Sequence, residues 1–405
     1  MDQSQHGRRR PCLSRALHAA RSLHEGVTRT AALIHNLFDN RVLWTHCEKV
    51  QVGVMLRGGV GDVMIAARWL HNVIPALAAN ADIVIDIYYA LPENITFIFG
   101  KFDRVRYLYR DVAFEYVRRY YNFSFVINHL GYVEIDFANM QDEFAKLPFA
   151  SAIEPWLAGV ERFSPFTTRD YHPDLGKNFY SLIEQSRFKR HSILEAQTGS
   201  PAPVSPFPFL LPEGDRLSAF PQLRNKYITV HDGWDAQLKM GDRRPTKAYP
   251  HEKWSALIAA LKNRFPELAV VQLGGKTGAP IPGVDLNLRN GIGFGASASV
   301  LKNALLHIDT DSGLVHVAAS LGTRSIVLFG PTDIGYYGYP SNINLNVEGC
   351  NNCWLRTGNW IIACMIGDPI PTCMNNIDVE SIIRSVDSLL AGDSCAAPAA
   401  KVEFV

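Results

Sequence analysis

Short apolar segments alternate with helix-like segments and polar turns from about Val50 onward. The clearest example, residues 305–333, contains an apolar run, a polar turn, a helix from about Leu314, a second buried strand at 325–329 and another polar turn. This order predicts the βαβ unit of an open parallel sheet. Both turns follow a strand, so we expect them side by side at the carboxyl edge of the sheet, where such sheets bind ligands.

The first polar turn, residues 309–313, opens a helix, and the free backbone N–H groups of a helix N-terminus suit a phosphate or diphosphate. The candidate N–H groups belong to Ser312, Gly313 and Leu314. The side chain of Ser312 either contacts the ligand as well or only caps the helix. The sequence therefore predicts an anion site at this turn.

Two side chains beside this turn are candidate ligand contacts. Asp311 and His316 are about one helical turn apart and lie on nearby faces of the helix. We interpret both as ligand-binding residues, although Asp311 has the alternative role of an N-cap. Thr332 belongs to the second polar turn and is a further candidate on the same rim.

A glycine-rich turn follows the strand expected at 51–56 and precedes a helix expected at 63–77. Glycine lets the backbone turn sharply and approach a ligand closely. Asp62 is expected to start the helix, either as a catalytic residue or as an ordinary N-cap. The turn lacks the G-x-G-x-x-G pattern, so it is not a dinucleotide-binding fingerprint. Its other candidate residues are Arg57, Gly58, Gly59 and Gly61.

The remaining pattern divides the chain into two α/β halves. Further strands are expected at 82–89, 105–109, 123–128, 227–231 and 269–273, and further helices at 250–265, 296–305 and 376–392. Residues 199–212 hold five prolines, which cannot continue a helix or a central strand, so the linker is expected there. The predicted organisation is a basic helical extension (1–49), an α/β domain (50–198), a linker (199–222), a second α/β domain (223–375), a helix (376–393) and a tail (394–405).

Composition narrows the functional classes. Of 405 residues, 47% are apolar and 20% charged, which is typical of globular domains. Forty basic and thirty-nine acidic residues give a net charge of +1, so bulk charge does not favour a nucleic-acid partner. No apolar run approaches the roughly 18–20 residues that a membrane span needs. We expect a soluble, cytoplasmic protein.

The first forty residues are basic, and their apolar positions recur at helical spacing. Such a segment is either a transit peptide, a helix that lies on a membrane surface, or an ordinary helical extension. The second alternative would give peripheral contact with the inner face of the membrane.

A basic loop lies between the strand expected at 227–231 and the helix that begins near Pro250. Basic side chains ahead of a helix N-terminus suit a diphosphate, because charge-assisted donors and the helix dipole act together. Lys239 and Lys247 are the candidates, and solvated surface lysines are the alternative.

Four of the seven cysteines crowd into one segment, as Cys350, Cys353, Cys364 and Cys373. A C-x₂-C pair with two further cysteines can form a tetrahedral sulfur site for zinc or iron. Buried free thiols are the alternative. The odd cysteine total argues against a disulfide framework. No ligand set for activating water accompanies these residues, so any metal is expected to be structural.

Together these motifs resemble the heptosyltransferase family, glycosyltransferase family 9. The resemblance rests on GGVGD at 58–62, the VHDGW and KAYPHEKW stretches within 230–254, VVQLGG at 270–275, DTDSGLVHVAASLGTRSIVLFGPTD at 309–333 and the cysteine segment. It covers about residues 50–390. It implies a GT-B fold, in which two Rossmann-like domains face each other across a cleft, with the acceptor in the N-terminal half and the nucleotide-sugar donor in the C-terminal half.

The resemblance also implies an inverting glycosyl transfer without a cofactor for the chemistry. Asp62 would be the general base, and Lys247, the N–H groups at 312–314 and Lys239 would meet the charge of the leaving diphosphate. Asp311 and His316 would hold the donor. By family precedent the donor is ADP-heptose and the acceptor is a lipopolysaccharide-core-like glycan, or alternatively a protein. Anionic acceptor sugars would meet basic side chains, for which the candidates are Arg57, Arg68, Lys101 and Arg104.

The chain also departs from the family pattern. Members usually carry a proline a few residues after the Gly-Asp turn, whereas here Arg68 lies in that region and Pro75 is the first proline. Two alternative functions follow from the same fold: a sugar-nucleotide epimerase or hydrolase, and a non-catalytic sugar-nucleotide-binding scaffold. A non-catalytic scaffold has no physical need for Asp62 or for the DSGLVH motif, so their presence argues against that alternative.

Overall fold

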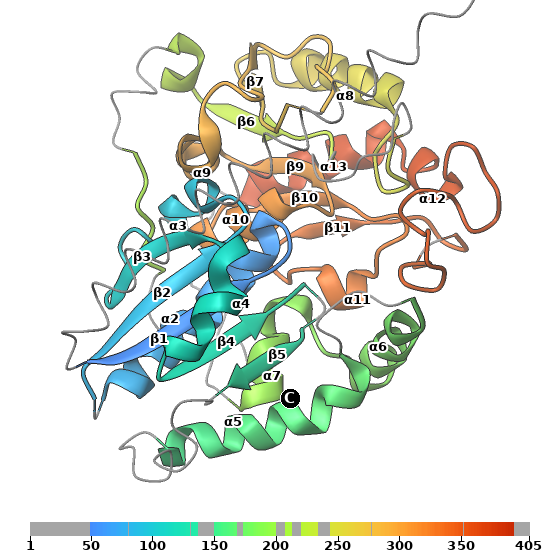
Figure 1. Ribbon diagram of the computed structural model, residues 1–405. Helices are drawn as coiled ribbons and strands as arrows, with labels where there is room; N and C mark the ends of the chain where they lie inside the picture. Colours follow the sequence, from blue (N-terminus) through green and yellow to red (C-terminus); the bar gives the residue numbers. More distant parts are fainter. Residues whose placement is uncertain are drawn as a thin grey trace, which may run out of the picture.

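The computed structural model describes residues 49–79, 81–129, 131–136, 150–167, 173–199, 207–212, 220–233, 244–276, 278–350 and 352–392. Most of the predicted N-terminal extension, much of the predicted linker and the tail at 394–405 lie outside these ranges, so the predictions for them stay predictions. The chain forms two α/β lobes, each built around one sheet (Figure 1).

The N-terminal sheet has the strand order β3-β2-β1-β4-β5. Its strands are parallel except for β5, which pairs antiparallel with β4 at one edge. The strands are β1 (Val50–Leu56), β2 (Ile83–Tyr89), β3 (Val105–Arg110), β4 (Phe123–Ile127) and β5 (Val133–Asp136). Continuous apolar runs in β1, β2 and β4 are buried, as expected for strands covered on both faces.

Helices of this lobe connect and cover the strands. They are α2 (Val60–Ala78), α3 (Thr96–Phe99), α4 (Phe114–Val117), α5 (Ala150–Phe163), α6 (Pro173–Ser186) and α7 (Ile193–Thr198). Short 3-10 turns add η1 (Pro92–Asn94), η2 (Asp111–Ala113), η3 (Arg118–Tyr120), η5 (Ser164–Phe166) and η6 (Arg190–Ser192).

The C-terminal sheet has the strand order β11-β10-β9-β6-β7-β8, and its neighbouring strands pair in parallel. Its strands are β6 (Tyr227–Val230), β7 (Ala269–Gln272), β8 (Leu286–Asn287), β9 (His307–Thr310), β10 (Ser325–Leu328) and β11 (Ile343–Leu345). Its helices are α8 (His251–Arg264), α9 (Gly293–Asn303), α10 (Gly313–Leu321), α11 (Ile334–Tyr337), α12 (Thr372–Asn375) and α13 (Val379–Gly392), preceded by η8 (Pro221–Arg224).

The two lobes share one buried hydrophobic cluster. It contains the apolar side of α2 with β1, β2 and β4, and it continues into Leu314 and Val317 of α10, Tyr336 of α11 and Trp354. A second cluster lies between the C-terminal sheet and helices α8 and α13. The shared cluster means that α2 and α10 pack directly against each other.

The predicted α/β class, with two predominantly parallel sheets, is confirmed. Several details differ from the prediction. Helices α2 and α9 begin at Val60 and Gly293 rather than at 63 and 296, and β9 extends through Asp309 and Thr310 into the predicted turn. The edge strands β5, β8 and β11 were not predicted. Within the described part of the chain, no helix is long and apolar enough to cross a bilayer.

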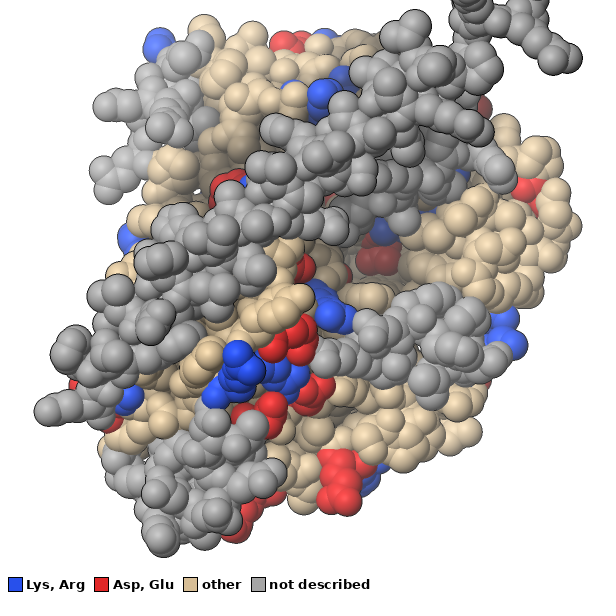
Figure 2. All heavy atoms as spheres, in the orientation of Figure 1, with Lys and Arg blue, Asp and Glu red and all other residues tan. Residues whose placement is uncertain are grey.

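Charges of both signs are mixed on the face shown in Figure 2. Around α4 and β5, Arg118 forms ion pairs with Glu115, Glu134 and Asp136. This mixture agrees with the near-zero net charge of the whole chain.

Candidate active site

The candidate site lies where the first turns of α2 and α10 meet. A methyl group added to Gly61 would lie 2.7 Å from Cδ2 of His316 and 2.8 Å from Cα of Gly313. Position 61 therefore has no room for any side chain, and only glycine fits without a shift of the neighbouring atoms. The glycine at 61 therefore allows the glycine-rich turn of one lobe to touch the polar turn of the other.

Asp62 is the third residue of α2, and Gly59 is the N-cap. The backbone N–H of Gly59 donates to Oδ2 of Asp62 over 2.9 Å, which satisfies one of the otherwise free N–H groups at the helix start. Gly58 has φ +120°, a conformation that favours glycine, and its carbonyl accepts from the Tyr89 hydroxyl over 3.0 Å. Asp62 is therefore held by the helix start rather than being the N-cap itself.

The second oxygen of Asp62 forms an ion pair with Arg190. Nη2 of Arg190 donates to Oδ1 over 2.7 Å, and the arginine side chain is 2% exposed while Asp62 keeps 26% exposure. Burial by itself would raise the pKa of Asp62, but the charges of Arg190 and His129 and the bond from Gly59 bring that pKa below its usual value. Asp62 is thus an ionised carboxylate that remains partly exposed.

The turn after β9 is organised by Asp309. Its carboxylate accepts from the backbone N–H of Thr310 over 2.7 Å and from the hydroxyl of Ser312. The Ser312 hydroxyl in turn accepts from the backbone N–H of Leu314 over 3.2 Å. Ser312 is therefore the N-cap of α10, which is the simpler of its two predicted roles, and the Leu314 N–H is already bonded.

Two histidines complete the surroundings of Asp309. Nδ1 of His231, after β6, lies 3.0 Å from Oδ1, and Nε2 of His307 lies 3.1 Å from Oδ2. Although burial would raise it, the pKa of Asp309 is lowered by His231 and His307. The fully buried cluster fixes the polar turn to the neighbouring strands.

Lys247 reaches the same turn from the basic loop. Its Nζ donates to the backbone carbonyl of Asp311 over 2.9 Å. Burial raises the pKa of Asp311, which the charge of Lys247 opposes. Thr332, buried in the turn after β10, lies beside Asp311. The structure therefore gathers three candidate donor-binding residues, and the turns after β9 and β10 lie side by side as expected.

His316 is a neutral imidazole beneath this junction. Burial, followed by the charge of Arg190, lowers its pKa to about 3. Its Nδ1 and the Tyr339 hydroxyl lie 2.8 Å apart and share a hydrogen bond, and the tautomer of the ring determines which of them donates. His316 therefore contacts α2 through its ring and is suited to polar contacts that require no charge.

Other predicted residues lie elsewhere. Lys239 is outside the described residues. Arg104 pairs with Asp82 just before β2, at the amino edge of the sheet, whereas Asp62 follows the carboxyl end of the parallel strand β1. Arg57 is half-buried directly before Gly58, and Arg68 lies among His191, Glu195 and Tyr339 at the junction of the lobes. These basic residues therefore lie in different parts of the N-terminal lobe, and their role in acceptor binding stays a prediction.

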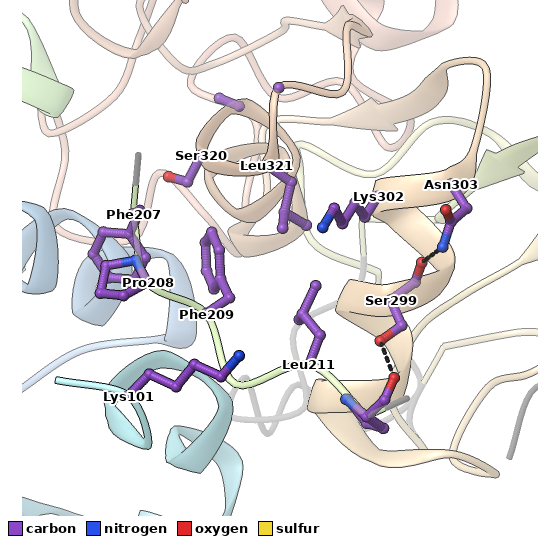
Figure 3. Close-up of a pocket in the computed structure, with 13 residues that line it drawn as sticks. Lys101, Phe207, Pro208, Phe209, Leu211, Ser299, Lys302, Asn303, Ser320 and Leu321 are labelled. Carbon is purple, nitrogen blue, oxygen red and sulfur yellow. Dashed lines mark hydrogen bonds between the residues drawn. The ribbon is translucent and has the colours of Figure 1, made fainter. Parts of the chain in front are cut away.

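Lys101 lines a cavity of about 760 Å³ instead (Figure 3). Phe207, Phe209 and Leu211 form much of its wall, and Lys302 approaches from α9. The cavity borders the C-terminal end of α10, whereas the candidate site is at the N-terminal end. It is therefore separate from Asp62.

The four cysteines of the predicted metal site are close enough to affect one another. Burial, together with the charges of the other three thiols, raises the pKa of Cys373 to about 12. Among the described residues, however, no group of three or more His, Cys, Asp or Glu side chains has the arrangement of metal ligands. The predicted metal site is thus not formed in this structure.

Arg190 was not identified from the sequence. It is 128 residues from Asp62 and belongs to a segment that shows no recognisable motif. A buried arginine is visible only after folding, because sequence pattern does not distinguish it from a solvated one. His231 belongs to the VHDGW motif, but the sequence places Asp309 in a turn, so the hydrogen bond between them is not predicted.

Comparison with known proteins identifies the fold and the family. Residues 191–355 match the sequence model of glycosyltransferase family 9 (heptosyltransferase). No curated protein matches the chain. Among solved structures, the chain is similar to Escherichia coli ADP-heptose LPS heptosyltransferase II, with 14% identity and a TM-score of 0.50 over 85% of this chain and 100% of that chain.

The chain is also similar to the iron-containing dodecameric glycosyltransferase TibC of enterotoxigenic E. coli, with 12% identity and a TM-score of 0.52 over 85% of this chain and 77% of that chain. A structure of TibC in complex with ADP-D-beta-D-heptose gives the same identity and coverage and a TM-score of 0.51. These similarities establish the GT-B fold. Together with the family match they confirm the resemblance seen in the sequence: residues 191–355 of this chain match glycosyltransferase family 9 (heptosyltransferase).

Proposed function

We propose that the protein is an inverting glycosyltransferase that moves heptose from ADP-heptose to a hydroxyl group of a glycan or protein acceptor. The observation that carries this proposal is the meeting of an ionised carboxylate, Asp62, with the N-terminus of α10 and with Lys247 at the junction of the lobes. The ADP-heptose complex of the structurally similar TibC supports the choice of donor.

In the proposed reaction, Asp62 takes the proton of the acceptor hydroxyl as that oxygen attacks the anomeric carbon of the sugar. The bond from this carbon to the diphosphate oxygen breaks, and the leaving nucleoside diphosphate keeps the electron pair. Its negative charge is met by Lys247 and by the dipole of α10. Asp311, His316 and Thr332 hold the donor from the C-terminal lobe.

The decisive first experiment measures thermal stability and release of nucleoside diphosphate with a panel of nucleotide sugars. Because a ligand that binds only the folded state stabilises it, ADP-heptose is expected to raise Tm. Stabilisation by a UDP- or GDP-sugar instead would replace the donor and keep the reaction class. If a nucleotide sugar binds but no nucleoside diphosphate is released in the presence of any lipopolysaccharide-core or protein acceptor, the scaffold alternative is favoured.

Lys247→Ala is expected to weaken donor binding by about 10–100-fold, since it removes a charge-assisted hydrogen bond. Isothermal titration with ADP-heptose or ADP measures the effect. Lys262→Ala is the matched control, because Lys262 forms an exposed ion pair with Asp285. Equal donor affinity in the two variants would remove Lys247 from the donor site.

We also propose that the cysteine segment holds a structural zinc or iron ion. The iron content of TibC and the mutual proximity of the four thiols support this proposal. Binding would draw the sulfur atoms together and release their protons. Cys353→Ser is then expected to lose about one equivalent of metal and to lower Tm, as measured by elemental analysis and thermal unfolding. Cys47→Ser, outside the segment, serves as control, and a metal-free wild type of equal Tm would contradict the proposal.

A cytoplasmic location at the inner face of the membrane would suit a lipopolysaccharide-core-like acceptor. The basic N-terminal segment would supply the peripheral contact. In this proposal the N-terminal lobe binds the acceptor, with Arg57 and the glycines at 58, 59 and 61 near it.

A further inference from the structure

Arg190 has an unusual environment for an arginine. Its side chain is 2% exposed, and Nη2 donates to Oδ1 of Asp62 over 2.7 Å. Its Nε and Nη1 are buried and make no hydrogen bond of normal geometry among the residues that the structure describes, and the polar group beside the guanidinium is the buried hydroxyl of Tyr336. A buried N–H group without a hydrogen bond lowers the stability of the folded state. If the ion pair served only stability, we would expect the other N–H groups of Arg190 to be hydrogen-bonded as well.

The backbone around Arg190 is fixed on both sides. Nζ of Lys189 donates to the carbonyl of Gly335 over 2.5 Å, and the ring of His191 stacks on Tyr339 with centroids 4.8 Å apart. Both contacts tie η6 to the segment around α11 in the other lobe. The backbone of Arg190 is therefore held in place independently of the bond between its side chain and Asp62.

We propose that Arg190 is a positioning residue that keeps Asp62 ionised and orients one of its oxygens, leaving the carboxylate ready to accept the proton of the acceptor hydroxyl. This inference rests on the proposed function, in which Asp62 is the general base. Arg190 itself has no assigned contact with the reacting atoms.

The charges around Asp62 explain why one arginine has this effect. Arg190 favours the carboxylate, and Gly59 adds a bond from the start of the same helix. His129 adds a positive charge only at acid pH, because burial lowers its pKa. Asp311 of the donor turn exerts a repulsive charge, and His316 of α10 is neutral. From α11, the buried hydroxyls of Tyr336 and Tyr337 are un-ionised at neutral pH because burial raises their pKa values. Without Arg190, burial becomes dominant and raises the pKa of Asp62.

The first test measures kcat/KM against pH for Arg190→Gln and Arg190→Lys. The acid limb of the profile is expected to move upward by about 1–3 pH units in Arg190→Gln, so that activity is low at neutral pH and recovers as pH rises. Arg190→Lys keeps the charge without the planar fork and is expected to give a smaller shift.

Arg106→Gln is the matched control for these variants. It breaks another buried arginine–aspartate pair, with Asp86 of β2 on the face of the sheet opposite α2. It should lower stability without moving the acid limb. An unchanged acid limb in Arg190→Gln, or an equal shift in Arg106→Gln, would overturn the role of Arg190.

A second test does not depend on catalysis. Above about pH 4 an unfolded aspartate is ionised. If Asp62 stays protonated in folded Arg190→Gln, the unfolded state binds fewer protons, so the free energy of unfolding falls as pH rises from about 4 to 7. Urea unfolding should show this loss in Arg190→Gln and not in wild type or in the double variant Arg190→Gln/Asp62→Asn. If Arg190→Gln loses stability with rising pH but the wild type shows no transfer activity, the proposed function is rejected and the effect of Arg190 on the pKa of Asp62 stands. If Arg190→Gln shows no such loss of stability, the effect of Arg190 on Asp62 is rejected.

Discussion

Asp62→Asn is expected to lower kcat by about 10²–10⁴-fold, the usual range for removal of a general base. Asparagine keeps the size of the side chain and an oxygen for the N–H of Gly59, but it cannot take a proton from the acceptor. Donor binding should survive, because Lys247 and the turn before α10 are unchanged. Single-turnover transfer together with titration of the donor separates the two effects.

Stability must be measured alongside this variant. Asparagine leaves the buried Arg190 without its counter-charge, and breaking a buried ion pair typically costs about 3–5 kcal/mol. Asp82→Asn is a suitable control, since Asp82 is half exposed and pairs with Lys49 and Arg104 before β2. Transfer at the wild-type rate in folded Asp62→Asn would show that another group is the base.

Gly61→Ala is expected to reduce kcat/KM by about 10–100-fold, although alanine is the better helix former. Its methyl group would lie 2.8 Å from the Cα of Gly313, which is backbone and cannot rotate away. The lobes must separate, and a misplacement of about 1 Å between reacting groups is enough for a loss of this size. Overpacking should also lower the free energy of unfolding by about 1–3 kcal/mol.

The control for this substitution is Gly291→Ala. Gly291 is exposed, and an added methyl group would find its nearest neighbour at 3.7 Å, an ordinary van der Waals distance. The two variants are compared by steady-state kinetics and urea unfolding. If Gly61→Ala behaves like Gly291→Ala, the close contact between the lobes is not needed for activity.

Much of the fold follows from local pattern. The strands β1, β2 and β4 were predicted within one or two residues because continuous apolar runs end at glycine or polar residues. The start of α2 was predicted three residues late, because the sequence from Gly59 to Gly61 resembles a turn. The hydrogen bond from the backbone N–H of Gly59 to the carboxylate of Asp62 allows the helix to begin earlier.

The strand β9 shows a different limit. Asp309 and Thr310 are polar and were assigned to the turn, yet they complete a fully buried strand. Asp309 is stable there because His231 and His307 surround it, and no local rule predicts such partners. The same limit applies to Arg190. In contrast, motif residues such as Asp311 and Lys247 could be grouped from the sequence, because strand order alone brings their loops to one edge.

The contact between Gly61 and Gly313 also affects how the lobes close. It places the first turns of α2 and α10 together, and each helix N-terminus carries roughly half a positive charge from its aligned peptide dipoles. Two such ends repel each other unless negative charge lies beside them. Asp62 and Asp311 supply part of this charge, and a bound diphosphate would supply more. We therefore expect a negatively charged ligand to bring the two lobes closer together at this contact, because its charge reduces the repulsion between the two helix N-termini.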